Sequence, residues 1–449
     1  MRIERVVGVI CLLVAWTAAR AEDAAPPQDV ASTIEALKQR NRDLERRLTD
    51  LESKMGEGAQ VQQMRREEIK AVAEEILASS KAQMALPNWL DNLKFGGDMR
   101  LRYEVRQFDD NTTAGVLDNT KIFRFRLRFG VTKTWPNDDL EIGFRLATGA
   151  DNDPTSTNQT FGDKNLAGST TNASAFEEYG NFGVDRVYAK WTPKCLKGLT
   201  LIAGKMANPW ETSNTMWDTD VNPEGVWAEY RVPGLGPVEP FVGAGWFQMY
   251  TSNMKKNASL MAYDAGLRWA VTPEVKYTTA LTYYNFTNLD VAFASYPSGG
   301  VNKLSNTGAA AGQYPILDFI NKVDFKICKI PTNVFVDWTH NTNNESGNGR
   351  SDAFAVGVKL GEVKKKGDWA ARYVYKVIQQ DAVLAYFADS DFGYPSRTAR
   401  KGHEFGVDYA LTDALTAGVT LFYDTPLAGS TGTSNVKTLF IQTDLVWKF

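Results

Sequence analysis

The last twelve residues of the chain, Thr438 to Phe449, alternate between apolar and polar side chains. Large apolar residues lie at nearly every second position counted back from the terminal aromatic, with Thr443 as the exception: Phe449, Trp447, Leu445, Ile441 and Leu439. Lys448, Asp444 and Gln442 fall on the other face. This period predicts a β-strand with one apolar and one polar face. In an apolar phase such a strand needs partners and a closed sheet, because its backbone groups are otherwise unsatisfied.

The same period recurs throughout the sequence after Pro87. In the clearest run, Lys121 to Val131, the odd positions are apolar and the even positions include Arg124, Arg126 and Arg128. We expect sixteen such strands, joined alternately by short links such as Thr272 to Glu274 and by long polar stretches such as Gln380 to Lys401. Alternating connection lengths are typical of outer-membrane barrels. The predicted fold is all-β, a 16-stranded antiparallel transmembrane β-barrel, with a soluble all-β protein as the alternative.

The N-terminus predicts a secreted protein. Arg2 and Arg5 precede an apolar run that ends in a small-x-small cleavage pattern, so residues 1–21 are expected to be a signal peptide. The run is too short for a membrane-spanning helix. Cleavage would change the formal net charge from −3 to −5, because three arginines and one glutamate are lost. This balance excludes nucleic acid as an expected partner, and Cys195 and Cys328 do not predict a disulfide framework.

Residues 22–86 predict a periplasmic α-helical coiled-coil segment before the barrel of residues 87–449. With Ile34 at heptad position a, Leu37, Leu44 and Leu51 occupy position d, and Asn41 is the polar residue at another a position. This pattern favours parallel self-association. An intramolecular helical hairpin is the alternative, because glycines interrupt the heptads after position 55. One asparagine at position a also favours dimers.

Basic residues concentrate on the polar faces of the first three predicted strands. These seven arginines, called here the arginine row, are Arg100, Arg102, Arg106, Arg124, Arg126, Arg128 and Arg145. Neighbouring strands lie about 5 Å apart, so the row is expected to line one wall of the lumen. The alternative is a solvated polar face without a selective role.

Acidic residues concentrate in the link between the fifth and sixth strands, Ala207 to Asn222. This link carries Glu211, Asp218 and Asp220, together with two tryptophans that either pack or contact solutes. Its position resembles that of the loop that folds into the lumen of sixteen-stranded general porins. Acidic groups opposite an arginine wall would create a transverse field, and charge and pore width set selectivity in channels.

Several motifs together resemble the putative porin family of Gram-negative outer membranes: the run from Phe95 to Glu104, the arginine-rich run from Phe123 to Phe129, Gly204-Lys205-Met206, and Asn222-Pro223-Glu224-Gly225. The resemblance covers Asn88 to Phe449. It implies a water-filled channel for passive diffusion of small polar solutes and ions, in the cell outer membrane with the N-terminal segment in the periplasm. An anion- or phosphate-selective porin is an alternative, although the dense lysine loops of phosphate-selective porins are not evident.

The resemblance also implies partners. These are outer-membrane lipid and lipopolysaccharide, the barrel-assembly machinery acting on Phe449 and Trp447, and further copies of the chain in a homotrimer. Contact with peptidoglycan through the N-terminal segment is a further expectation, and an anchor between outer membrane and cell wall without significant conductance is an alternative function.

The sequence predicts no enzyme, cofactor or metal site. General bases are most often histidines, and the chain has only His340 and His403, near Asp337 and Glu404 in sequence. No nucleophile motif accompanies them, and no metal-ligand spacing is present.

Overall fold

The structure is a computed structural model that describes residues 90–109, 119–149, 153–162, 182–251, 257–289, 313–343, 350–394, 396–428 and 436–449. It also describes five helical residues in the N-terminal region, Gln39, Arg42, Asp43, Arg46 and Arg47. The chain divides into two units, Met1–Asn88 and Trp89–Phe449. The predicted signal peptide and the heptad positions of the predicted coiled coil lie outside the described residues. No helix among the described residues is long and apolar enough to cross a membrane.

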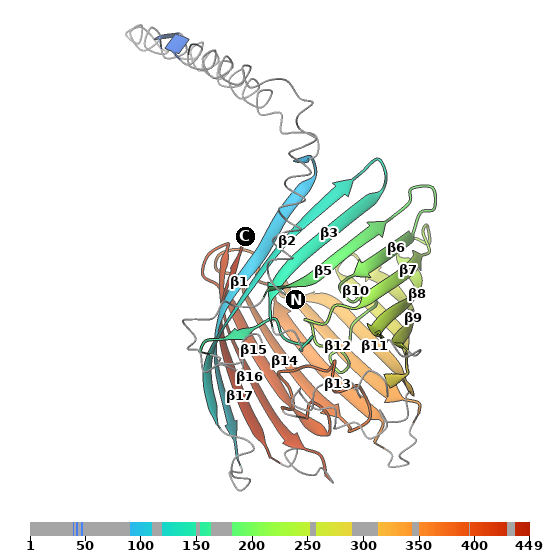
Figure 1. Cartoon of the computed structure of the whole chain (residues 1–449), viewed down its shortest axis with the longest axis vertical. Helices are drawn as coiled ribbons and strands as arrows, with labels where there is room; N and C mark the ends of the chain where they lie inside the picture. The colour runs from blue at the N-terminus through green and yellow to red at the C-terminus, as the bar shows by residue number, and fades with distance from the viewer. Residues whose placement is uncertain are drawn as a thin grey trace. The chain divides into compact units, whose positions relative to one another are not determined.

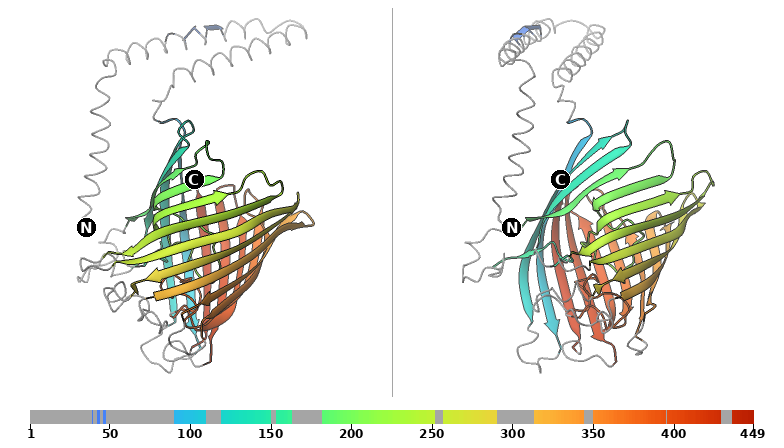
Figure 2. Two further views of the ribbon diagram at one scale, coloured as in Figure 1. Left: turned by 90° about the vertical axis from the view of Figure 1, so that its right-hand side faces the viewer. Right: turned by 45° about the vertical axis from the view of Figure 1, so that its right-hand side comes forward.

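The second unit is a closed antiparallel β-barrel (Figures 1 and 2). Its first strands are β1 (Leu93–Phe108), β2 (Thr120–Trp135), β3 (Leu140–Thr148), β5 (Phe182–Trp191), β6 (Leu199–Lys205), β7 (Glu224–Arg231), β8 (Val238–Tyr250) and β9 (Ala258–Thr272). They continue with β10 (Val275–Thr287), β11 (Gln313–Ile327), β12 (Ile330–Asn341), β13 (Asp352–Gly361), β14 (Trp369–Ile378), β15 (Arg400–Ala410), β16 (Leu415–Pro426) and β17 (Thr438–Lys448). A two-residue strand, β4 (Gln159–Thr160), pairs with β2 inside a connection. Within the described residues the barrel therefore has the predicted sixteen strands.

The barrel closes by pairing β1 with β17, the strand that the sequence predicts at the C-terminus. Arg102 lies opposite Asp444 in this register. Beyond β17, Gly97 and Phe449 exchange two backbone hydrogen bonds with N···O distances of 3.0 and 3.2 Å. Gly97 is required by close packing, because a Cβ atom there would lie 2.1 Å from the carbonyl oxygen of Arg128.

The two faces of the barrel differ in side-chain type. Large apolar side chains stay exposed on the outer face, for example Phe123, Phe129, Trp269, Leu281 and Phe405. Because these side chains are apolar, the outer face suits contact with lipid. The alternate residues on β1 and β2, such as Glu104 and Arg126, are buried inside the barrel.

The interior is not uniformly polar, in contrast to the expected polar lumen face. A buried apolar cluster joins inward residues of β7 to β11, including Trp227, Phe247, Tyr284 and Ile316, to residues of the long connections. Connections fold into the barrel and cover the apolar inner face of these strands. They include part of the stretch Gln380 to Lys401, which the sequence predicts as a long loop beyond the strands.

Candidate functional site

The connection of residues 206–223, the β6–β7 segment, lies inside the barrel. Trp210 packs against Trp217, Phe247 and Tyr284, with ring centroids 5.3–5.4 Å apart. The tip of the segment is fixed to β12, because the Asn214 backbone N–H and Nδ2 donate hydrogen bonds to Asp337 Oδ2 at 2.8 and 3.1 Å. The two predicted tryptophans therefore hold the segment by packing in the apolar cluster.

A second connection also enters the barrel. This β14–β15 segment comprises residues 379–394 and 396–399, and its residues Ala382, Val383, Leu384 and Phe392 are fully buried. It contacts the β6–β7 segment directly, since Asp218 N–H donates to the Phe387 carbonyl oxygen (2.7 Å) and Ser390 N–H donates to Asp218 Oδ2 (2.9 Å).

Part of a third connection, residues 153–162 or the β3–β5 segment, completes the contact. Thr157 donates hydrogen bonds from its backbone N–H and its hydroxyl to Asp220 Oδ2 at 3.2 and 3.0 Å. Ser390 Oγ donates to the Thr155 carbonyl oxygen at 3.1 Å. The three segments contact one another inside the barrel, and we refer to them together as the constriction.

The arginine row lies on β1, β2 and β3, with Arg100 opposite Arg126 and Arg102 opposite Arg124. Carboxylates on the strands pair with most of it. Asp98 binds Arg126 and Arg128 (2.6 and 2.7 Å), Asp444 binds Arg102 (2.7 Å), Glu104 lies 3.5 Å from Arg102 and Arg124, and Asp185 binds Arg145. Arg106 is held differently, because its guanidinium stacks on the rings of Tyr394 and Phe440.

These contacts reduce the net charge of the row. Seven arginines and four strand carboxylates leave an excess of three positive charges. Two carboxylates of the constriction also reach the row, Asp220 at 3.6 Å from Arg128 and Asp391 at 3.5 Å from Arg102. The excess then falls to one positive charge.

The three predicted acidic residues of the β6–β7 segment lie in different places. Only Asp220 pairs with the arginine row. Glu211 binds Arg268 of β9 and Lys322 of β11, at 2.7 and 3.2 Å. Burial raises the pKa of the Glu211 carboxyl, but the Arg268 hydrogen bond and the nearby charges of Lys322 and Arg268 outweigh burial and leave that pKa below its ordinary value.

Asp218 occupies a different environment. It accepts hydrogen bonds from the backbone N–H groups of Asp220 and Ser390, both at 2.9 Å. Burial and the negative charges of Asp389 and Asp220 raise the pKa of the Asp218 carboxyl well above its ordinary range. Its role in the structure is therefore to join the two segments.

Sequence reasoning missed the carboxylates of the β14–β15 segment as lumen residues. Asp391 reaches Arg102, and Asp389 Oδ2 lies 2.8 Å from Nζ of Lys376, which is buried on β14. The signal that could have indicated an inward course is the apolar run Ala382-Val383-Leu384-Ala385 inside an otherwise polar stretch.

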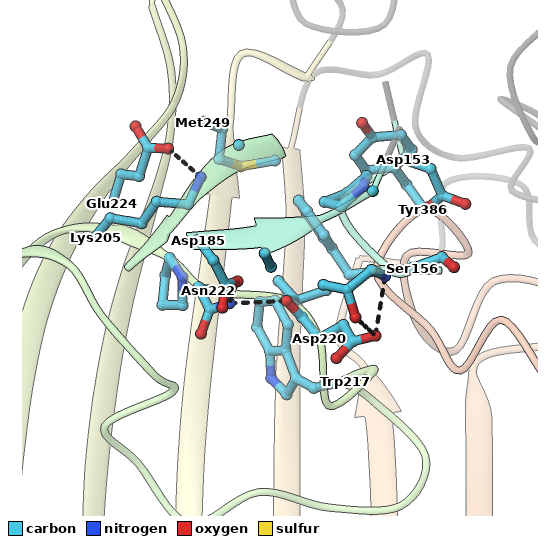
Figure 3. A pocket seen from close by; sticks show the side chains of 18 of the residues that line it. Asp153, Ser156, Asp185, Lys205, Trp217, Asp220, Asn222, Glu224, Met249 and Tyr386 are labelled. Atoms are coloured by element: carbon cyan, nitrogen blue, oxygen red, sulfur yellow. Dashed lines mark hydrogen bonds and ion pairs between the residues drawn. The ribbon is translucent and has the colours of Figure 1, made fainter. Parts of the chain in front are cut away.

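A cavity of about 460 Å³ lies beside the constriction (Figure 3). Trp217 and Asp220 line it from the β6–β7 segment. Four of its polar side chains pair with one another: Lys205 binds Glu224 at 2.8 Å, and Asn222 Nδ2 donates to Asp185 Oδ1 at 2.6 Å. Asp185 in turn binds Arg145, so the cavity adjoins one end of the arginine row.

The two histidines lie apart from the constriction's contacts. His340 Nδ1 is 2.9 Å from Asp352 Oδ1, and His403 Nδ1 is 2.9 Å from the Tyr373 hydroxyl. Their sequence neighbours have other partners, since Asp337 binds Asn214 and Glu404 binds Arg372 at 2.7 Å. In the part of the chain that the structure describes, no group of three or more His, Cys, Asp or Glu side chains is placed to hold a metal ion.

Comparison with known proteins decides the family. A family model described as "Putative porin" matches residues 17–122, 112–314 and 316–449. The chain belongs to this porin family. The family and the barrel fold place it in a Gram-negative outer membrane as a channel for passive diffusion of solutes, and they are those of a channel rather than an enzyme. A comparison with curated proteins gives no match.

Several solved porin structures match the chain. The high-pH structure of Pseudomonas putida OprB is 13% identical, with a TM-score of 0.51 over 81% of this chain and 96% of that one. The low-pH OprB structure is 12% identical, with a TM-score of 0.44 over 81% and 94%. A triple mutant of the Rhodopseudomonas blastica porin is 10% identical, with a TM-score of 0.39 over 80% and 100%. At 13% identity, the first of these likenesses supports the barrel fold.

Proposed function

We propose that this porin passes small polar solutes and ions along a water-filled path between the arginine row and the constriction, with weak preference for charge. The near-neutral balance of the arginine row carries this proposal. Carboxylates from the strands and from two inward segments leave it one excess positive charge out of seven. A strongly anion-selective or phosphate-selective porin would need more uncompensated basic groups along its path.

Planar-bilayer recording of the purified protein tests this function. We expect steady ion currents and a small zero-current potential in a salt gradient. Neutralising three arginines of the row, as R124Q/R126Q/R128Q, changes the net charge of the row from one positive to two negative. The zero-current potential should then shift in the direction of higher cation selectivity. The variant K194Q/K364Q removes two exposed positive charges from the turns after β5 and β13 and serves as control. A barrel without current would instead favour an anchor, and an unchanged potential in the arginine variant would remove the row from selectivity.

We also propose where the N-terminal segment lies, how the chains associate and what the barrel contacts. The segment of residues 22–86 lies in the periplasm, associates through its heptads and is a candidate for peptidoglycan contact. The barrel forms a homotrimer in contact with lipid and lipopolysaccharide. Phe449 and Trp447 form the signal for the barrel-assembly machinery, and the two hydrogen bonds between Phe449 and Gly97 support a role in closing the sheet. The mass of the detergent-extracted, unheated complex distinguishes trimer from dimer or monomer.

A further inference from the structure

The β14–β15 segment is built into the barrel interior rather than resting on it. Ala382, Val383 and Leu384 have no exposed surface, and Phe392 is equally buried. Asn341 Nδ2 of β12 donates a hydrogen bond to the Asp381 carbonyl oxygen at 2.8 Å. Burying these apolar side chains stabilises the segment in this position. The carboxylates that follow are thus fixed inside the barrel.

Asp389 and Asp391 extend from this segment toward two basic groups on two different strands. Asp389 contacts Lys376 of β14, and Asp391 contacts Arg102 of β1. The two basic side chains are buried, with 3% and 6% of their side-chain surface exposed, whereas the two carboxylates keep 26% and 29%. The carboxylates therefore present their charge to water in the lumen more than their basic partners do.

Both carboxylates add a negative charge to basic groups that already have an acidic partner. Arg102 already binds Asp444, and Lys376 lies 3.4 Å from Glu404. Burial raises the pKa of the Asp391 carboxyl, but the positive charges of Arg102, Arg100 and Arg106 and a hydrogen bond from Gln442 outweigh burial, so that pKa lies below its ordinary value. Asp391 is therefore ionised at neutral pH.

We propose that Asp389 and Asp391 are selectivity-determining residues, and that the β14–β15 segment is a second constriction element which offsets the positive charge of the arginine row. The proposal rests on the proposed channel function. Without Asp391 the excess on the arginine row rises from one positive charge to two. Asp389 forms a local group with Lys376, Arg372, Glu404 and Asp408, which together carry one excess negative charge. Loss of Asp389 brings the net charge of this group to zero.

The size of the effect follows from Coulomb's law. A unit charge roughly 8 Å from a permeating ion in water changes the anion-to-cation permeability ratio about twofold to fivefold, depending on salt screening. Neutralising one carboxylate should shift the ratio by this factor, and neutralising both should shift it further in the same direction.

The test compares D389N, D391N and D389N/D391N with the wild-type full chain in planar bilayers under a tenfold KCl gradient. We expect the zero-current potential to shift in the direction of higher anion selectivity in each single variant and to shift further in the double variant. E274Q/E362Q removes two negative charges from the exposed turns after β9 and β13 and should leave the potential unchanged. D389E/D391E keeps the charge and should retain wild-type selectivity.

The outcomes separate the two proposals. Absence of current in the wild-type protein overturns the channel function and this inference with it. Wild-type current with an unchanged potential in D389N/D391N overturns the inference alone. If D389E/D391E shifts the potential as much as D389N/D391N, the effect comes from displaced packing and not from charge, which also overturns it. Shifts confined to the neutralising variants support it.

Discussion

Replacing Trp210 by alanine tests whether the β6–β7 segment narrows the channel. The Trp210 side chain is only 4% exposed and contacts the rings of Trp217, Trp227, Phe247 and Tyr284. It lies outside the strands, so its removal leaves the hydrogen-bonded barrel wall intact. The expected effect is a released segment in a folded barrel.

The magnitude follows from the buried surface. A buried tryptophan removes about 150–250 Å² from water, which corresponds to about 4–6 kcal/mol at roughly 25 cal/mol per Å². Large-to-alanine substitutions in protein cores cost about 3–5 kcal/mol, in agreement with this figure. The two hydrogen bonds between Asn214 and the Asp337 carboxyl contribute about 1–3 kcal/mol each. Trp210 therefore supplies more of the anchoring than either of these hydrogen bonds at the tip of the segment.

Liposome swelling with uncharged solutes of increasing mass measures the result. We expect W210A to admit larger solutes than the wild type and to conduct more current per channel, with its β-sheet circular dichroism unchanged. W210F keeps an aromatic ring against Phe247 and Tyr284 and should stay near the wild-type size limit. Tryptophan fluorescence reports whether the segment has moved. A released segment with an unchanged size limit would refute the idea that it narrows the path.

Two further predictions concern the Asp218 junction and the closing seam. Because the raised pKa of Asp218 favours its protonated form in the folded protein, wild-type stability should rise as pH falls through that pKa toward the ordinary value. D218N should therefore exceed the wild type in urea unfolding at pH 7, by on the order of 1 kcal/mol, and lose this advantage near pH 4; a constant difference across pH would contradict this. G97A places a Cβ atom against the Arg128 carbonyl oxygen and should lower the yield of folded barrel, while G96A, whose nearest contact is 3.6 Å away, should fold normally; equal yields from liposome refolding would disprove the steric argument.

The strand count could be predicted because the signal is local and strong where a strand separates lipid from polar groups. The alternation of Phe123 and Phe125 with Arg124 and Arg126 specifies both faces of β2 without any knowledge of its neighbours. The pattern fails where both faces are apolar. In β11 the inward residues Tyr314 and Ile316 pack in the internal cluster while Phe319 remains exposed. The alternation of apolar and polar residues is therefore clear only from Val323 to Ile327, whereas the strand begins ten residues earlier, at Gln313.

The candidate site was less accessible from sequence, because long-range contacts decide it. The arginine row could be placed on one wall, since strand order and side-chain period are enough to locate it. The charge balance of the row could not be predicted from the sequence. Asp444 reaches Arg102 only across the closing seam, and Asp391 reaches it from a connection 289 positions away in sequence. Glu211 and Asp220 belong to one short segment, yet they bind opposite sides of the interior because that segment crosses it.

The carboxylates that balance the arginine row differ in how freely they can change. Asp98, Glu104 and Asp444 lie on strands, and a register slip by one residue would turn their side chains to the lipid face, so their positions depend on the barrel itself. Asp220 and Asp391 come from segments that are held by packing and by contacts with one another, not by the strand ladder. Substitution at these two positions can therefore adjust the charge of the pathway while the sheet remains intact. Selectivity and barrel stability are separable in this porin to the extent that the loop carboxylates, rather than the strand carboxylates, set the final charge of the row.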